Sequence, residues 1–177
     1  HKEYRRQRQM CIRDRRYTQE VWGLPSDFKT LHATPKMRLA WARHKTELMT
    51  QYTDYLTERA KAFRPYLKTA RNLYALPVIQ PESEEWYGQS LSAFLAHYDY
   101  VAIEAMPFME KANQPAAWLQ DLAQRVGQHP QGFEKMVFEL QTVDWNTQKP
   151  IPMDTFKNQI SLLRKAGAKH LGYYPDN

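Results

Sequence analysis

The chain has 177 residues, of which 42% are hydrophobic, so it is long enough for one domain with a buried core. Its formal net charge of +6 at pH 7 raises the question of an anionic partner such as nucleic acid. Residues 1–16 carry seven basic and two acidic side chains, however, which leaves 18 basic and 17 acidic side chains in the remainder. The remainder is therefore nearly neutral, and we expect no nucleic-acid partner.

Residues 1–16 have no hydrophobic period, and their run from Gln9 to Arg15 resembles translated sequencing-adapter DNA. The alternative interpretation is a basic disordered arm. Under both interpretations we divide the chain into a segment 1–16, which we exclude from the fold, and a folded part 17–177. The single cysteine, Cys11, lies in the excluded segment, so the folded part offers no disulfide and no cysteine nucleophile. No apolar run is long enough for a membrane span, and no signal peptide is visible.

The first predicted element is a long amphipathic helix that begins at Thr34 and Pro35, an N-cap residue followed by proline at the first helical position. Apolar residues recur along it at Met37, Ala40, Trp41, Leu48, Tyr52, Tyr55, Leu56 and Phe63. A short strand over residues 69–75 follows and ends before Pro77. Ser83 is then expected to cap a helix that buries Leu91, Phe94 and Leu95.

Three more strands are expected, over residues 98–106, 135–141 and 170–174. A helix with Leu119, Leu122 and Val126 on one side separates the first two. Asp154 opens another helix, which has Phe156, Ile160 and Leu163 directed inward and Gly167 placed to end it. The strand centres are about 30 to 36 residues apart, which is the length of a βαβ unit and indicates a parallel sheet.

A barrel or a doubly wound sheet could cover such a parallel sheet with helices. No glycine-rich phosphate loop follows any strand, which disfavours the nucleotide-binding form of the doubly wound sheet. Four strand-helix units cannot close a barrel. We therefore expect an α/β fold that forms the C-terminal half of a (β/α) barrel, with parallel strands and outer helices, and with its first and last strand edges unpaired.

In a (β/α) barrel the functional side chains come from the C-terminal ends of the strands and the loops that follow. This rule selects a rim of aromatic and acidic candidates, namely Tyr74, Glu104, Met106, Glu139, Gln141, Asp144, Trp145, Tyr173, Tyr174 and Asp176. Flat sugar rings stack on aromatic side chains, and carboxylates attract hydroxyl and amino groups, so this mixture suits a sugar polymer. No histidine has metal-ligand spacing, so we expect no metal and no cofactor.

Each candidate also has a structural interpretation. Alternation along a strand directs only one of Tyr173 and Tyr174 toward the barrel centre. A polar barrel interior or a site is favoured over plain packing for Glu139, because a carboxylate buried without partners is costly, whereas Glu104 is equally consistent with a site or with packing. Trp145 is expected to contact ligand from an exposed loop. Trp86, at the start of a helix, could contact ligand or cover its own helix.

Arg71 could contact substrate or form an ion pair with Glu104 or Glu139. Trp41 and Trp118 lie on helix stripes and are expected to pack between helices or in the core.

Five ordered motifs resemble the C-terminal domain of bacterial poly-β-1,6-N-acetyl-D-glucosamine N-deacetylases. They are Thr69-Ala-Arg-Asn, Gln80-Pro-Glu-Ser-Glu with Trp86, Ala105-Met-Pro with Met109-Glu110, Val137-Phe-Glu-Leu-Gln with Asp144-Trp145, and Gly167-Ala-Lys with Gly172-Tyr-Tyr-Pro-Asp. The resemblance implies a (β/α) barrel that binds and hydrolyses the partly deacetylated polymer in the periplasm or at the outer membrane. It also implies that Trp86, Trp145, Tyr174 and Asp176 contact sugar, with Glu139 as a supporting carboxylate.

The sequence departs from that family in two ways. The His-Asp-Asp stretch that resembles the family's catalytic centre is absent, and so is the deacetylase domain. We therefore assign no catalytic residue in this chain and leave its status as an enzyme open. The alternative function is a non-catalytic module that binds the exported polymer and guides it, without direct insertion into a membrane.

Overall fold

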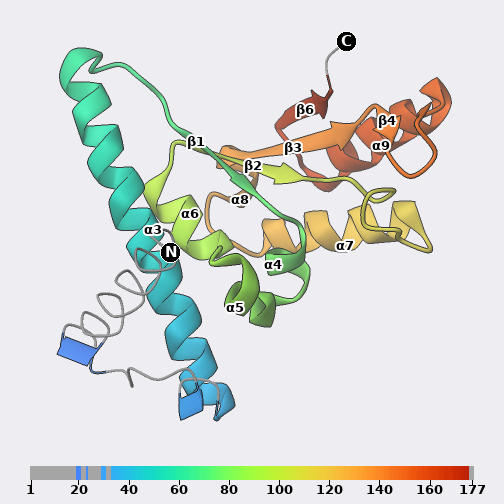
Figure 1. The fold of residues 1–177 in the computed structure, drawn as a ribbon. Helices are drawn as coiled ribbons and strands as arrows, with labels where there is room; N and C mark the ends of the chain where they lie inside the picture. The colour runs from blue at the N-terminus through green and yellow to red at the C-terminus, as the bar shows by residue number, and fades with distance from the viewer. Residues whose placement is uncertain (1–18, 21–22, 24–28, 31–32, 176–177) are drawn as a thin grey trace, which may run out of the picture.

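The computed structural model describes residues 19–20, 23, 29–30 and 33–175, so the expectations for residues 1–16 and for Asp176 lie outside the described residues. Figure 1 shows the arrangement of the elements. In chain order they are α3 (Pro35–Phe63), β1 (Ala70–Leu73), α4 (Leu76–Ile79), the 3-10 turn η1 (Pro81–Ser83), α5 (Glu84–Tyr87), α6 (Leu91–His97), β2 (Tyr100–Glu104), α7 (Pro115–Gly127), α8 (Gly132–Lys135), β3 (Met136–Gln141), β4 (Val143–Asp144), β5 (Lys149–Pro150), α9 (Met153–Ala166) and β6 (His170–Tyr174).

The four predicted strands form one parallel sheet in the order β1-β2-β3-β6, as expected from their spacing. Helices α6, α7 and α9 connect successive strands, so each step along the sheet is a βαβ crossover. The alternation and the pairing therefore confirm the α/β class. The sequence did not predict the short antiparallel hairpin β4-β5, which lies in the connection after β3.

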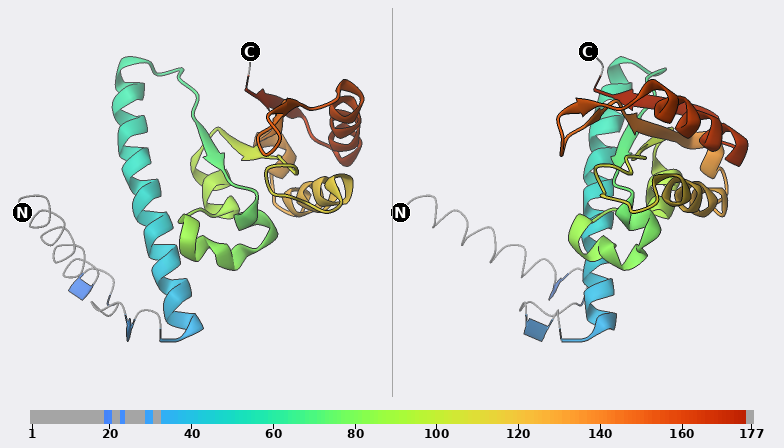
Figure 2. Two further views of the ribbon diagram at one scale, coloured as in Figure 1. Left: turned by 45° about the vertical axis from the view of Figure 1, so that its right-hand side comes forward. Right: turned by 90° about the vertical axis from the view of Figure 1, so that its right-hand side faces the viewer.

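One face of the sheet carries the hydrophobic core. Side chains from the strands and from α6, α7 and α9 meet there, and Figures 1 and 2 show α6 and α7 on one side of the strands. The fully buried members include Leu73, Phe94, Val101, Ile103, Leu119, Leu122, Val126, Met136, Phe138, Leu140 and Leu163. On the opposite face of the sheet, Asn72 and Tyr174 are exposed, and Glu104 and Glu139 are half-buried. This second face corresponds to the interior of a barrel.

The predicted helix signals are largely confirmed. The Thr34 hydroxyl accepts a hydrogen bond from the amide of Met37 at 3.2 Å, which caps α3. Gly167 ends α9 with a φ of 112°, a conformation that favours glycine. The prediction for Ser83 was wrong, because its side chain forms no cap bond and is fully buried. The chain between Ser83 and α6 forms the extra turn α5, and Ser90 occupies the N-cap position of α6.

Helix α3 has two unlike faces. Its buried residues are small or polar and include Ala42, Thr46 and Thr50. Most of the apolar stripe seen in the sequence lies exposed, with Tyr52 at 57% and Phe63 at 88% of their full accessibility. The helix therefore meets α5 and α6 through its polar side and presents its apolar side outward.

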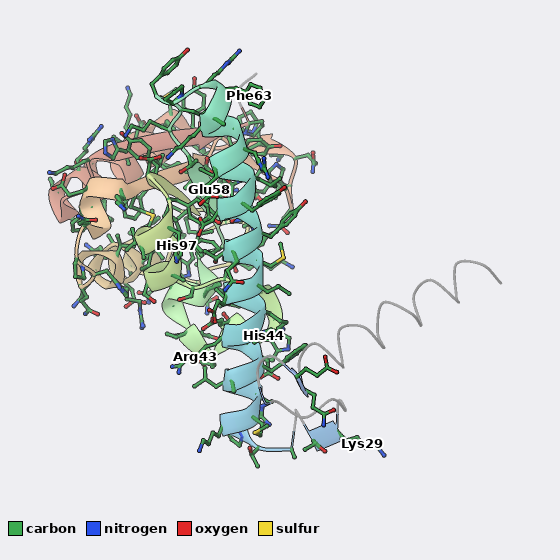
Figure 3. All side chains as sticks on the ribbon, turned by 90° about the vertical axis from the view of Figure 1, so that its left-hand side faces the viewer. Lys29, Arg43, His44, Glu58, Phe63 and His97 are labelled. Atoms are coloured by element: carbon green, nitrogen blue, oxygen red, sulfur yellow. The ribbon has the colours of Figure 1, made fainter. Side chains whose placement is uncertain are left out.

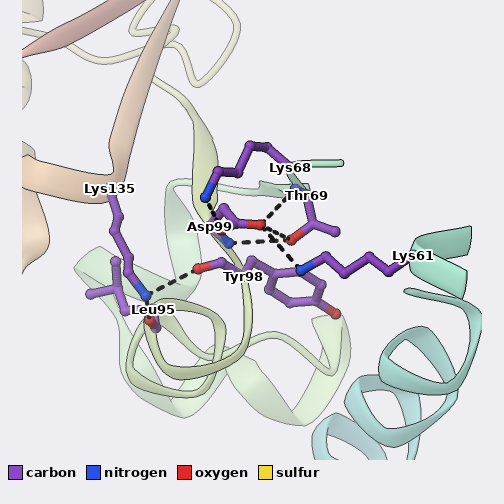
Figure 4. Close-up of polar contacts among 7 residues, drawn as sticks. All are labelled: Lys61, Lys68, Thr69, Leu95, Tyr98, Asp99 and Lys135. Atoms are coloured by element: carbon purple, nitrogen blue, oxygen red, sulfur yellow. Dashed lines mark hydrogen bonds and ion pairs between the residues drawn. The ribbon is translucent and has the colours of Figure 1, made fainter. Parts of the chain in front are cut away.

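A cluster of polar side chains at the N-terminal end of the strands joins the starts of β1 and β2 (Figure 4). The Asp99 carboxylate accepts hydrogen bonds from the Thr69 amide at 2.9 Å and the Thr69 hydroxyl at 3.1 Å. Lys68 and Lys61 form ion pairs with the same carboxylate at 3.2 and 3.7 Å. The hydrogen bond from the Thr69 amide is the largest influence on Asp99, and together these partners lower the pKa of Asp99 to about 2.

We predict that Asp99→Asn lowers the free energy of unfolding at pH 7 by about 1 kcal/mol, a value reduced for partial exposure to solvent. Because the pKa of Asp99 is lower in the folded state, its contribution is complete above the unfolded pKa of about 4. It is lost as the pH falls toward 2. Urea unfolding of both proteins at several pH values from 7 to 3 tests this, and a difference that stays constant over that range would contradict it.

Candidate functional site

The C-terminal ends of β3 and β6 bring two aromatic rings together. Gln141 on β3 is paired in register with Tyr174 on β6, and Trp145 follows directly after the short strand β4. The ring centroids of Trp145 and Tyr174 are 6.1 Å apart, with 55° between the ring planes. Trp145 is half-buried rather than fully exposed, since Tyr174 lies against it. These two predicted residues therefore form one aromatic surface on the rim.

Buried Gln141 holds the connections around this surface. Its side-chain oxygen accepts hydrogen bonds from the amides of Phe108 and Met109 at 3.1 and 2.9 Å. Its side-chain nitrogen donates to the carbonyl of Val143 at 2.8 Å. One side chain at the end of β3 thus fixes the loop after β2 and the start of the hairpin that leads to Trp145. The sequence placed Gln141 on the rim but gave no sign of this bridging role.

The loop around Trp145 is ordered by its own acidic residue. The Asp144 carboxylate accepts hydrogen bonds from the Thr147 hydroxyl at 2.8 Å and the Asn146 amide at 2.9 Å. These bonds, led by that of Thr147, lower the pKa of Asp144. The Asn146 side chain also donates to the carbonyl of Phe108 at 3.1 Å, a second link to the loop after β2. Asp144 therefore acts as an anchor of the loop.

Two glutamates stand side by side on the open face of the sheet. Glu104 on β2 is paired in register with Glu139 on β3, and both are half-buried. Burial raises the pKa of Glu139. Burial is also the main cause that raises the pKa of Glu104, followed by the charges of Glu139 and Glu110. The pair forms an electronegative patch, and a cationic group bound beside it would reduce the repulsion between the two carboxylates.

Trp86 lies apart from the Trp145 surface, on the single turn α5 in the connection after β1. Its side chain is 73% exposed. Its neighbour Tyr87 contacts Tyr74, with ring centroids 5.0 Å apart, and Tyr74 stands at the end of β1. The rim therefore carries a second aromatic group, and Tyr87 is a member that the sequence analysis missed. Only its position next to Trp86 could have indicated it.

Polar contacts attach α5 to α3. The Thr46 hydroxyl donates to the Glu84 carboxylate at 2.7 Å, and Arg38 forms an ion pair with Glu85 at 3.4 Å. The side chain of Lys45 also donates to the carbonyl of Glu85. Three contacts thus hold the turn that presents Trp86.

One of the two interpretations of Arg71 was wrong, and the expectation for Trp118 is confirmed. Arg71 forms no ion pair with Glu104 or Glu139 within the described part of the chain, because its guanidinium lies over the ring of Phe94, 5.6 Å from the centroid. Trp118 packs against the core, as expected. Trp41 is half-buried, with its ring centroid 5.3 Å from that of His44.

One hollow in the described part of the chain lies beside α5, the turn that carries Trp86. It is an open groove of about 900 Å³ between α3, η1 and α6, lined by residues that include Arg43, Glu47, Glu82 and His97. Among the described residues no group of three or more histidine, cysteine, aspartate or glutamate side chains is placed to hold a metal ion. No helix within the described ranges has the length and apolar character needed to cross a membrane.

Comparison with known proteins gives consistent matches. A family model for hypothetical glycosyl hydrolase family 13 (GHL13) matches residues 10–174. The poly-β-1,6-N-acetyl-D-glucosamine N-deacetylases of Escherichia coli K12 and O157:H7 are each 40% identical over 161 residues, which is 88% of this chain and 24% of theirs. This chain therefore spans about a quarter of their length.

A solved structure, the PgaB (BpsB) glycoside hydrolase domain of Bordetella bronchiseptica, is 41% identical, with a TM-score of 0.85 over 90% of this chain and 45% of that one. The fold is thus similar to part of a glycoside hydrolase domain of the (β/α)-barrel type. Because the family model covers nearly all of the folded part, the chain belongs to the hypothetical glycosyl hydrolase family 13.

Proposed function

We propose that this chain forms the polymer-binding part of a glycoside hydrolase domain that binds and hydrolyses partially deacetylated poly-β-1,6-N-acetyl-D-glucosamine. The observation that carries the proposal is the aromatic pair of Trp145 and Tyr174 on the same open sheet face as Glu104 and Glu139. Aromatic rings offer flat surfaces for sugar rings. Neighbouring carboxylates with raised pKa values favour a ligand that brings positive charge, such as the free amine of glucosamine.

The proposed sugar contacts are Trp86, Trp145, Tyr174 and Asp176, with Glu139 as the supporting carboxylate. Support for Trp86 comes from its exposure beside the contact of Tyr74 with Tyr87. β1 and β3 are separated by β2, so the two aromatic groups lie on opposite sides of the glutamate at the end of β2. A polymer that crosses the strands would meet aromatic, acidic and aromatic groups in turn.

The setting proposed for this activity is the periplasm or the outer membrane, by analogy with the relatives. The similar Escherichia coli proteins are named as N-deacetylases, yet the match covers only 24% of their length. We propose no deacetylase activity for this chain. We assign no catalytic residue to it either.

We predict that Trp145→Ala weakens binding of deacetylated β-1,6-glucosamine oligomers on the order of tenfold, because it removes the stacking surface. Asp176→Asn should also weaken binding, by removing charge attraction to an amine. The effect of Asp176→Asn should shrink at high salt, since salt screens exposed charges, whereas the effect of Trp145→Ala should persist. Calorimetric titration of both variants at 50 mM and 500 mM salt measures these differences, and unchanged affinity in both variants would remove them from the site.

Hydrolysis needs a separate test from binding. In a chimeric domain, residues 34–177 would replace the matching segment of the Escherichia coli K12 relative. Release of shorter oligosaccharides from the deacetylated polymer is the expected result. Binding without release, in a chimera that folds cooperatively, would favour a non-catalytic module that guides the polymer.

A further inference from the structure

The open groove beside α5 has the size of a binding site. Helix α3 forms one wall with six residues between Leu39 and Gln51, which span about 18 Å at the helical rise per residue. The other wall comes from η1, α5 and α6. Figure 3 shows two lining residues, Arg43 on α3 and His97 at the end of α6, on the same side of α3. Ligand sites measure about 300 to 1,000 Å³, so the groove of about 900 Å³ has room for several sugar units.

Polar contacts join the two walls of the groove. The Thr46 hydroxyl on α3 donates to the Glu84 carboxylate on α5 at 2.7 Å. Further along α3, Asp54 forms an ion pair with His97 at 2.7 Å. Two connections thus fix the helix against the opposite wall. Because the walls are already in place, a ligand would bind without the cost of ordering them.

The charged side chains of the groove define the chemistry of its ligand. Glu47, Glu82 and Glu84 outnumber Arg43, so the lining is acidic. Glu82 and Arg43 are exposed on opposite walls, and neither forms an ion pair or a side-chain hydrogen bond in the described part of the chain. A carboxylate accepts hydrogen bonds from amines and hydroxyls, and a guanidinium donates to hydroxyl and amide oxygens. A partially deacetylated glucosamine polymer carries all of these groups.

The groove is continuous with the rim through α5. Glu84, which lines the groove, and Trp86 belong to the same single turn. A polymer that passes Trp86 therefore reaches the groove next. Tyr52 follows Arg43 by nine residues, or about two and a half helical turns, so the exposed apolar side of α3 is on the opposite side of the helix. A neighbour on that apolar side would leave the groove open.

We propose that this groove is an accessory site for the same polymer, which takes glucosamine units beyond Trp86. Glu82 contacts their amines, and Arg43 contacts their hydroxyl and acetamide oxygens. The proposal rests on the proposed function, because the rim must hold the chain for the groove to receive its continuation. Two linked sites raise the affinity for an oligomer that reaches both of them. An oligomer short enough to lie on the rim alone gains nothing from the groove.

Glu82→Lys tests the proposal, with Glu58→Lys as the matched control. Glu58 is an exposed residue of α3 outside the groove lining, so both substitutions change the net charge equally. Each variant of the full chain is titrated calorimetrically with a trimer and a dodecamer of deacetylated β-1,6-glucosamine. Glu82→Lys should weaken dodecamer binding about fivefold and leave trimer binding unchanged. Glu58→Lys should change neither, whereas Trp145→Ala should weaken both.

Equal dodecamer affinities for Glu82→Lys and Glu58→Lys would overturn the accessory site, because the groove would then have no local effect. If Trp145→Ala still weakened binding of both oligomers, the proposed function would stand without the groove. The absence of binding of either oligomer to the unchanged chain would instead contradict the proposed function itself, and the accessory site with it.

NMR supplies a readout that needs no substitution. The backbone amide of Ser92, in the groove lining, should shift on titration with the dodecamer and stay in place with the trimer. The amide of Ser161, an exposed residue of α9, is the control and should respond to neither oligomer. A Ser92 signal that ignores a bound dodecamer would also overturn the proposal.

Discussion

Replacing Gln141 with leucine is expected to lower the free energy of unfolding by about 3 kcal/mol and to weaken oligomer binding at the same time. The side chain is fully buried and makes three hydrogen bonds to the backbone. Leucine fills a similar volume but leaves the amides of Phe108 and Met109 and the carbonyl of Val143 without that partner. Each such group costs about 1 to 3 kcal/mol when it stays buried. The two connections that frame Trp145 would loosen together.

Asn146→Ala is the control for this substitution. It removes another link between the same two connections, the exposed 3.1 Å hydrogen bond to the carbonyl of Phe108. Water can replace that bond, so the change in unfolding free energy should stay below about 0.5 kcal/mol. Urea unfolding and oligomer titration of both variants measure the two effects. A Gln141→Leu protein as stable as Asn146→Ala would show that the buried amide does not hold the rim.

Gly132→Ala is expected to destabilise the fold by about 3 kcal/mol, through overpacking. A Cβ at this position would stand 2.0 Å from the carbonyl oxygen of Val126 and 3.0 Å from its carbon. Both are backbone atoms at the end of α7, so neither can move aside by a change of rotamer. Gly132 also donates its amide to the carbonyl of His129 at 3.0 Å, which fixes the turn into α8. The substitution must therefore displace the end of α7 or the start of α8.

Gly127→Ala provides the comparison. A Cβ there would lie 2.8 Å from Cε2 of the Phe133 ring, and a side chain can give way where a backbone cannot. Gly127 also belongs to α7, where alanine is favoured over glycine by about 1 kcal/mol. Thermal unfolding should show a large loss of Tm for Gly132→Ala and a small change of either sign for Gly127→Ala. Similar losses for both would contradict this account of the close approach.

The parts of the fold that follow from local chemistry could be predicted from the sequence. Pattern and spacing identified the four parallel strands, and the signals at Thr34 and Gly167 marked real helix ends. The prediction for Ser83 failed because a hydroxyl residue before an apolar run caps a helix only if its backbone is extended. Here Ser83 has helical backbone angles and is followed by a separate turn. The hairpin β4-β5 has strands of two residues each, too short to leave a pattern.

The sequence indicated which residues lie at the candidate site better than it indicated the contacts that they make. The position of strand ends selected Trp145, Tyr174 and both glutamates, because parallel strands end at one edge. That Gln141 bridges two loops, or that Arg71 lies over Phe94 instead of pairing with an acid, depends on which side chains the fold brings together. Likewise the apolar stripe of α3 was visible in the sequence, but only the structure shows that most of its described side chains are exposed.

The indole signal of Trp145 tests the proposed function most directly. The chain has five tryptophans, and replacing each in turn by phenylalanine assigns every indole N–H in an NMR spectrum. On titration with a deacetylated β-1,6-glucosamine pentamer, we predict that the Trp145 signal shifts saturably and that those of Trp41 and Trp118 stay in place. A Trp145 signal that does not move while Trp41 or Trp118 responds, or no response at all in the folded chain, would contradict a polymer site on this rim.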